Sequence, residues 1–237
     1  MRKFAAIIAA VIFAFILSAG VAASSTASEP SFNRTIYVVN NSATVSNTEV
    51  ANDIPAFQAG LQDFEKYWGG SIRLVQVDKV PYRAWGITIS DRADCSQCLG
   101  YHDVKGVPFA RVFTMAGYSW TVTFTHELFE MAADPFIHRA DEVNGQFWLV
   151  EVGDPVEAEA FAYRHVSADG RLVKISDFVT DQWYRISATG KLDWANHVHR
   201  SRQLLAGGYA SYWGTADGRT GWQQVFAAHP NSPKVRH

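Results

Sequence analysis

Apolar residues recur at two spacings in the first half of the chain, and each spacing predicts one kind of element. Between residues 47 and 68 they lie three or four positions apart, which predicts an amphipathic helix that ends at Gly69-Gly70. The clearest helical pattern follows later, in the second half of residues 118–134. Strands are predicted from alternating or β-branched runs at residues 35–40, 71–77, 84–90 and 109–115. The predicted order is therefore β-α-β-β-β-α, an α+β arrangement.

The pattern changes after Pro135, where short strands and turns are expected. A boundary between two parts of the fold is predicted near residues 135–145. Residues 158–237 are expected to form an aromatic-rich, β/loop-rich C-terminal region, whose rings either fill a core or form a platform for a glycan or a peptide. Short strands are predicted at residues 147–152, 160–166 and 172–175.

The N-terminus has the composition of an export signal. Arg2 and Lys3 precede an apolar run over residues 4–17, and small residues follow it. This order is typical of a secretory signal peptide. Cleavage after Ala23 fits the small-residue rule, and Ala27 is a second candidate.

The signal-peptide interpretation divides the start of the chain into two segments. Residues 1–23 are removed, and residues 24–33 form a disordered leader rich in Ser and Thr. A retained membrane anchor is the alternative, because the apolar stretch is just long enough to span a bilayer. The small and hydroxylic residues at its end favour cleavage. We therefore expect an exported protein, secreted or held in the cell envelope, with no stable membrane insertion after cleavage.

Composition and charge narrow the class of protein further. The 237 residues are 48% hydrophobic and 19% charged, which is typical of a folded globular chain and excludes a disordered polymer. The formal net charge is −2, so no bulk electrostatic attraction draws the chain to nucleic acid. We expect no nucleic-acid partner.

The two cysteines, Cys95 and Cys98, are separated by two residues. In an exported protein this spacing favours a local disulfide that pins a loop. Reduced or metal-bound thiols are the alternatives, but a zinc ribbon would need a second pair of cysteines.

The second predicted helix carries the clearest chemical motif. His126 and Glu130 are four residues apart, so their side chains project from one helix face. Glu127 is rotated by about 100° from His126, where it can flank a metal ion without binding it. The same geometry underlies the His-Glu-x-x-His zinc motif, with Glu here as the second ligand. The alternative is an ordinary surface helix face.

A catalytic zinc also needs a third protein ligand and an open position for water. About two dozen residues beyond the helix motif, Glu151, Asp154 and Glu157 lie in a segment interrupted by Gly and Pro. Glu151 is a candidate third ligand, and Asp154 is a candidate partner of a ligand. Asp134, one turn beyond Glu130, is either a helix stop before Pro135 or a further residue of the metal site.

These features resemble the zincin metallopeptidases. The resemblance is carried by the order β-α-β-β-β-α, by the helix with His-Glu-x-x-Glu and by the later acid, whose distance is similar to that in the gluzincin branch. It implies that His126, Glu130 and Glu151 bind zinc. It also implies that Glu127 is the catalytic base that activates water.

The resemblance covers residues 34–157, which are expected to form a zincin-like metal-binding region. It implies that the strand at residues 109–115 binds the substrate backbone. The chain is also similar to uncharacterised secreted bacterial proteins that share a His-Glu-Leu-x-Glu stretch, a similarity that implies no particular activity.

The chain departs from the family at Glu130, where the family has a second His. A set of one His and two carboxylates also suits iron or manganese, so these ions are alternatives to zinc. Zinc held in this way would acidify its bound water less. His102 is a candidate extra ligand or electrophile, and Tyr184 or Tyr101 is a candidate to steady an oxyanion.

The predicted function is therefore a secreted, metal-dependent hydrolase, a zinc peptidase acting on a peptide or protein with metal-activated water. Two alternatives stay open. One is a catalytically inactive zincin-like protein that binds a metal ion or nothing, and the other is a surface-interaction protein that uses its aromatic C-terminal third. A serine hydrolase has little support, because Gly-x-Ser-x-Gly is absent.

Overall fold

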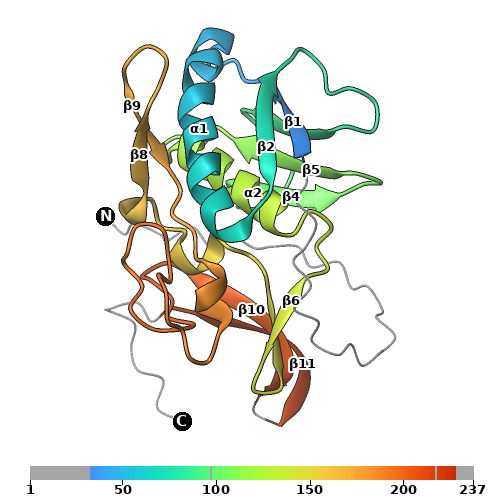
Figure 1. Ribbon diagram of the computed structural model, residues 1–237. Coiled ribbons are helices and arrows are strands. Elements are labelled where there is room, and N and C mark those ends of the chain that lie inside the picture. The colour runs from blue at the N-terminus through green and yellow to red at the C-terminus, as the bar shows by residue number, and fades with distance from the viewer. Residues whose placement is uncertain (1–32, 97, 217, 228–237) are drawn as a thin grey trace, which may run out of the picture.

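The computed structural model describes residues 33–96, 98–216 and 218–227 (Figure 1). The predicted signal peptide and almost all of the predicted leader lie outside the described residues. Within the described part of the chain, neither α-helix has the length and apolar character that crossing a bilayer requires.

A five-stranded sheet forms the N-terminal half of the fold (Figure 1). Its strands are β1 (Asn33–Asn40), β2 (Ser71–Gln76), β3 (Trp85–Ser90), β4 (Gly100–Val104) and β5 (Pro108–Phe113). They are arranged in the order β2-β1-β3-β5-β4. All neighbours are parallel except β4, which runs antiparallel to β5 at the edge of the sheet.

The position of β5 corrects one expectation. This strand covers most of predicted residues 109–115 and pairs with β3 on one side and β4 on the other. Its backbone groups are therefore used within the sheet, and the expectation that this strand binds the substrate backbone is wrong. The free edge beside the second helix belongs to β4.

Two helices lie against this sheet, α1 (Asn47–Trp68) against β2 and α2 (Trp120–Ala133) against β4 and β5 (Figure 1). The bounds of α1 agree with the predicted helix over residues 47–68. At its start the Ser46 hydroxyl accepts a hydrogen bond from the Glu49 backbone N–H at 3.0 Å, which caps the first turn. Gly69 ends it by donating its backbone N–H to the Glu65 carbonyl.

The helix α2 is surrounded by protein. Every residue from Thr121 to Met131 is buried, and the helix contacts α1 and β9 as well as the sheet. The Thr125 hydroxyl donates to the Thr121 carbonyl at 2.9 Å and accepts the Ser176 backbone N–H at 2.8 Å. Since buried polar groups need partners inside the protein, the ionisable residues of α2 must find theirs in neighbouring segments.

The C-terminal half is built from short strands and 3₁₀ turns. A second sheet has the order β11-β10-β7-β6, and β8 pairs with β9. The strands are β6 (Ala140–Val143), β7 (Gln146–Leu149), β8 (Tyr163–Val166), β9 (Leu172–Ile175), β10 (Tyr209–Ala216) and β11 (Arg219–Phe226). The turns are η1 (Asp154–Val156), η2 (Glu159–Phe161) and η3 (Asp181–Tyr184).

The α+β class is confirmed, but the order contains more strands than predicted. The segment expected to be a loop after residue 90 contains β4, so four strands separate the two helices. The aromatic-rich C-terminal region also contains β10 and β11, which were not among the predicted strands, and β8 begins at Tyr163 because η2 occupies the residues before it. The strand β4 is mostly polar, and pairing with β5 outweighs its weak local preference.

One hydrophobic core joins the two halves. Phe64 of α1, Phe129 of α2 and Phe178 from the C-terminal region form a triangle with ring centroids 5.2–5.4 Å apart. The core therefore continues across the predicted boundary at residues 135–145. Most C-terminal aromatic rings fill this core, whereas Trp213 and Trp222 remain 42% exposed.

We expect Phe129→Ala to destabilise the fold by about 3–5 kcal/mol, because it removes the ring shared by both halves. Urea unfolding followed by tryptophan fluorescence measures this change. Tyr82→Ala is the control, since Tyr82 is 93% exposed. A loss for Phe129→Ala no larger than that of the control would contradict the assignment of this ring to the core.

Candidate metal centre

Two residues one turn apart on α2 start the site. His126 and Glu130 are both buried, and His126 Nε2 lies 3.2 Å from Glu130 Oε1. The same nitrogen lies 3.4 Å from Oδ1 of Asp154, which begins η1. These three side chains are buried and close enough together to hold a metal ion.

The spacing of His126, Glu130 and Asp154 is compatible with a small cation held between them. Metal–ligand bonds of about 2.0–2.2 Å in a tetrahedral site separate neighbouring ligand atoms by about 3.3–3.6 Å. The separation of 3.4 Å between His126 and Asp154 lies in this range. The separation of 3.2 Å between His126 and Glu130 is also that of an N–H···O hydrogen bond, about 2.7–3.2 Å. The donor set of one imidazole and two carboxylates suits zinc, iron or manganese.

The turn that carries Asp154 is docked on α2 through backbone groups. The N–H groups of Gly153 and Asp154 both donate to Glu130 Oε1, at 3.2 and 3.3 Å. A methyl group at Gly153 would lie 2.5 Å from Nδ1 of His126. Glycine is therefore required here for close approach, and it allows the imidazole ring to pack directly on the turn.

The edge strand β4 contributes a second histidine. His102 Nδ1 lies 3.4 Å from both Glu127 Oε2 and Glu130 Oε2, and His102 Nε2 lies 3.4 Å from Glu151 Oε2. Glu151, the expected third ligand, thus has His102 as its nearest charged partner, while Asp154 accompanies His126 and Glu130. The six side chains that meet in this His–carboxylate cluster are His102, His126, Glu127, Glu130, Glu151 and Asp154.

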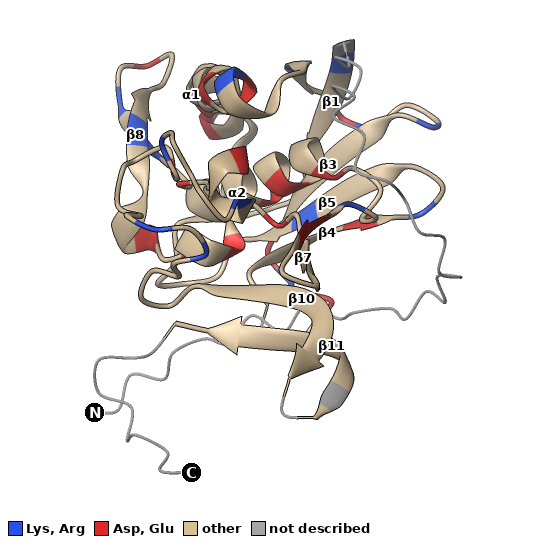
Figure 2. Cartoon of the chain, turned by 60° about the horizontal axis from the view of Figure 1, so that its bottom comes forward, with Lys and Arg blue, Asp and Glu red and all other residues tan. Residues whose placement is uncertain are grey.

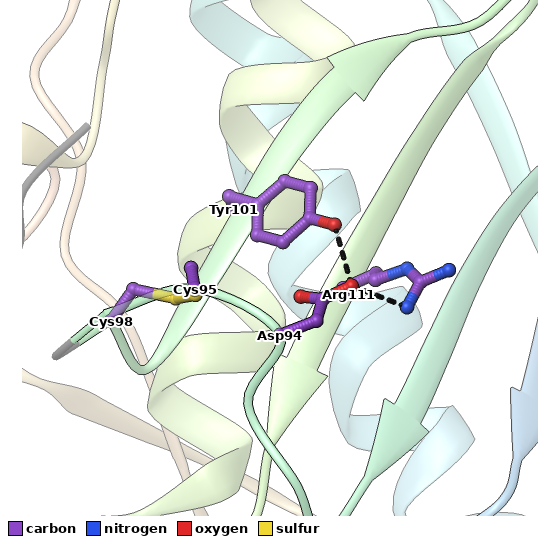
Figure 3. The surroundings of a disulfide bond; sticks show 5 residues. All are labelled: Asp94, Cys95, Cys98, Tyr101 and Arg111. Atoms are coloured by element: carbon purple, nitrogen blue, oxygen red, sulfur yellow. Dashed lines mark hydrogen bonds and ion pairs between the residues drawn. A yellow bond between two sulfur atoms is a disulfide. The ribbon is translucent and has the colours of Figure 1, made fainter. Parts of the chain in front are cut away.

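The opposite face of β4 is tied to the disulfide loop (Figure 3). Cys95 and Cys98 form a disulfide. Asp94, directly before it, accepts hydrogen bonds from the Tyr101 hydroxyl at 3.1 Å and from Arg111 at 2.6 Å. Because successive side chains of a strand point to opposite faces, Tyr101 faces away from the cluster that His102 joins.

The remaining predicted auxiliary residues have structural partners. The buried Tyr184 hydroxyl donates to the Glu151 carbonyl at 3.4 Å and thereby supports the backbone next to the cluster. Asp134 accepts the Arg139 backbone N–H at 2.6 Å and approaches His138 at 3.1 Å. Asp134 therefore organises the turn after α2, in agreement with its interpretation as a helix stop.

The cluster carries four carboxylates against two imidazoles, and within the described residues none of the four forms an ion pair with Lys or Arg. The residues of α2 include two acids and no basic residue other than His126 (Figure 2). An excess of buried negative charge is costly unless a cation or protons neutralise it.

The pKa values reflect this imbalance. Burial, together with the Glu130 carboxylate, raises the pKa of Asp154 to about 7. Burial also raises the pKa of Glu151 well above its ordinary value. Although burial opposes it, the Glu130 carboxylate raises the pKa of His126 well above its ordinary value. The cluster therefore retains protons that a divalent cation would displace.

A cavity of about 370 Å³ opens beside the cluster. His126 and Glu127 line it, whereas His102, Glu130 and Glu151 lie outside its lining. Two further lining residues were missed in the sequence analysis as site residues, Glu157 and Tyr209. Glu157 lies in the acid-containing segment that drew attention to Glu151, and Tyr209 is one of the aromatic residues of the C-terminal region, whose rings were expected either to fill a core or to form a platform for a glycan or a peptide.

A separate group, outside the His–carboxylate cluster, contains the buried Asp177 and Asp193 and the half-exposed His197. Both carboxylates are satisfied by backbone N–H groups, including those of Ala195 and Val198. This group therefore holds the loop after β9 in shape.

No protein-family model, curated protein or solved structure matches the chain. The interpretation of the site accordingly rests on its own geometry.

We expect Gly153→Ala to weaken metal binding by about 10–100-fold, because the added methyl group displaces the His126 ring. Competition with a chromogenic chelator measures the affinity. Gly190→Ala is the matched control, since its methyl group meets only the flexible Gln182 side chain, at 3.2 Å. Equal affinities for the two variants would show that the His126 ring does not bind the ion.

Proposed function

We propose that the chain is a metal-dependent hydrolase of zincin-like design that cleaves peptide bonds. The observation that carries the proposal is that His126 and Glu127, adjacent on α2, line the same cavity. His126 belongs to one group able to hold a metal ion, with Glu130 and Asp154, and Glu127 belongs to a second, with His102 and Glu130. With the ion in the first group, Glu127 offers a carboxylate beside it. A metal ligand and a base facing one substrate-sized space are the minimum that metal-assisted hydrolysis needs.

The ion would be held by His126, Glu130 and Asp154, with zinc as the expected metal and iron or manganese as the alternatives. This set differs from the expected one at its third member, since Asp154 Oδ1 and not the Glu151 carboxylate approaches His126. When bound, the ion would polarise a substrate carbonyl and acidify water.

The residues of the chain supply the proton transfer. Glu127 would accept the proton of the attacking water and pass it to the leaving amine. His102 Nδ1, 3.4 Å from Glu127 Oε2, would keep that carboxylate oriented. His102, on β4, would thus act as a positioning residue for the Glu127 carboxylate.

The sheet supports a peptide as the substrate. The strand β4 lies at the edge, and Leu99, immediately before it, lines the cavity. An extended peptide could add to this free edge through backbone hydrogen bonds and reach the cavity with its side chains. The start of β4 comes close to α2, because a methyl group at Gly100 would lie 2.8 Å from Glu127 Oε1.

Export of the protein belongs to the same proposal. The disulfide between Cys95 and Cys98 supports an oxidising compartment, such as the cell envelope or the outside of the cell. Edman sequencing of the protein recovered from the producing cells tests the cleavage site.

We expect one metal ion per chain. His126→Ala and Asp154→Asn should lose it, whereas Glu151→Gln should retain it, because Asp154 accompanies His126. Mass spectrometry of metal content after dialysis against zinc chloride measures the stoichiometry, with His199→Ala as the control. Loss of the ion in Glu151→Gln and its retention in Asp154→Asn would restore Glu151 as the third ligand.

Glu127→Gln should lower the rate of hydrolysis of a peptide mixture by about 10²–10⁴-fold while the ion stays bound, since an amide cannot accept the proton. Mass spectrometry of the cleavage products measures the rate. Glu142→Gln is the control, because Glu142 is exposed on β6. A zinc-loaded wild-type protein that cleaves no peptide would instead support an inactive metal-binding protein.

A further inference from the structure

Two acids that follow η1, Glu157 and Glu159, line the cavity, and they differ in their partners. Glu159 accepts the Ser119 backbone N–H at 3.1 Å and forms an ion pair with Lys174. Glu157 forms no hydrogen bond or ion pair within the described residues, and its Oε2 atom is buried. A carboxyl group in such a position lacks the interactions that normally offset its loss of hydration.

The surroundings of Glu157 offer it no lysine or arginine among the described residues that line the cavity. Burial and the Asp154 carboxylate raise the pKa of Glu157 to about 8. The carboxylates of Glu130 and Glu127 act on this pKa in the same direction, whereas the His126 imidazole lowers it. The unpartnered Oε2 atom could therefore accept a hydrogen bond from a cationic group of a ligand, which would favour the ionised carboxylate.

The cavity also provides an apolar path to Glu157. Leu99, Val122, Tyr209 and Phe226 contribute to its walls. Lysine and arginine combine an apolar stem with a charged head, so they can place the stem along such walls and the head beside a carboxylate. The volume of about 370 Å³ leaves room for one long side chain.

We propose that this cavity is a subsite for a basic side chain, Arg or Lys, of the substrate, with Glu157 as its counter-ion. The inference rests on the proposed function in taking a peptide as the substrate. Its location follows from the cavity itself, which joins Glu157 to the metal ligand His126 and to Glu127. Arginine is the better partner, because its planar guanidinium can donate two hydrogen bonds to one carboxylate.

Calorimetric titration of the zinc-loaded, full-length mature protein with two small hydroxamates tests the subsite. Arginine hydroxamate and leucine hydroxamate share the metal-binding group and differ in the side chain. We expect the arginine compound to bind about 10-fold more tightly or better, because it gains charge-assisted hydrogen bonds. Glu157→Gln should reduce this preference to less than about 3-fold. The control Glu142→Gln should leave it unchanged.

A second variant, Glu157→Lys, distinguishes loss of the subsite from local unfolding. Glu157→Lys should turn the preference toward glutamate hydroxamate, an outcome that local unfolding would not produce. Equal binding of the arginine and leucine compounds to the wild-type protein, or binding of neither, overturns the subsite. So does an arginine preference that persists in Glu157→Gln.

The outcomes separate this inference from the proposed function. A protein that prefers arginine hydroxamate through Glu157 and cleaves no peptide retains the subsite and loses the hydrolase. A protein that cleaves a peptide library without enriching Arg or Lys next to the cut, in both wild type and Glu157→Gln, retains the hydrolase and loses the subsite.

Discussion

The structure depends on the burial of a helix that carries ionisable residues. The helix α2 is enclosed by the sheet, α1 and β9, yet it contains His126, Glu127 and Glu130 in its buried interior. Such side chains are tolerated only where other polar groups meet them. The edge strand β4 supplies His102, and the turn after β7 supplies Asp154 together with two backbone N–H groups. The course of both segments is therefore tied to the charges on α2.

Local patterns in the sequence predicted the parts of the fold that rest on local interactions. The helix α1 could be placed to the residue because its apolar stripe and its terminal glycines are local signals. The pairing of His126 with Glu130 followed from helical spacing alone. The strand β4 could not be predicted, because its residues Gly100–Val104 are mostly polar and become a strand through pairing with β5 and contact with α2.

The residues of the site, too, could be predicted from the sequence only where local spacing determines them. Both acids of the segment at residues 151–154 were recognised as candidates, but their order of approach to His126 depends on how the turn docks. Gly153 presses on the imidazole ring, and this contact brings the next residue, Asp154, to Nε2. Glu151, two residues before Gly153, meets His102 instead. Spacing along the chain cannot distinguish these outcomes, because the turn geometry and the position of β4 decide them.

Charge balance links the site to the stability of the fold. The His–carboxylate cluster joins α2, β4 and the turn at η1, three segments that are far apart in the sequence. A cation bound between His126, Glu130 and Asp154 would offset the excess of carboxylates and cross-link α2 to that turn. Binding energy spent in this way is also folding energy, because the donor atoms are brought together only in the folded chain. The helix that would perform the chemistry is thus also the element whose burial the ion would stabilise.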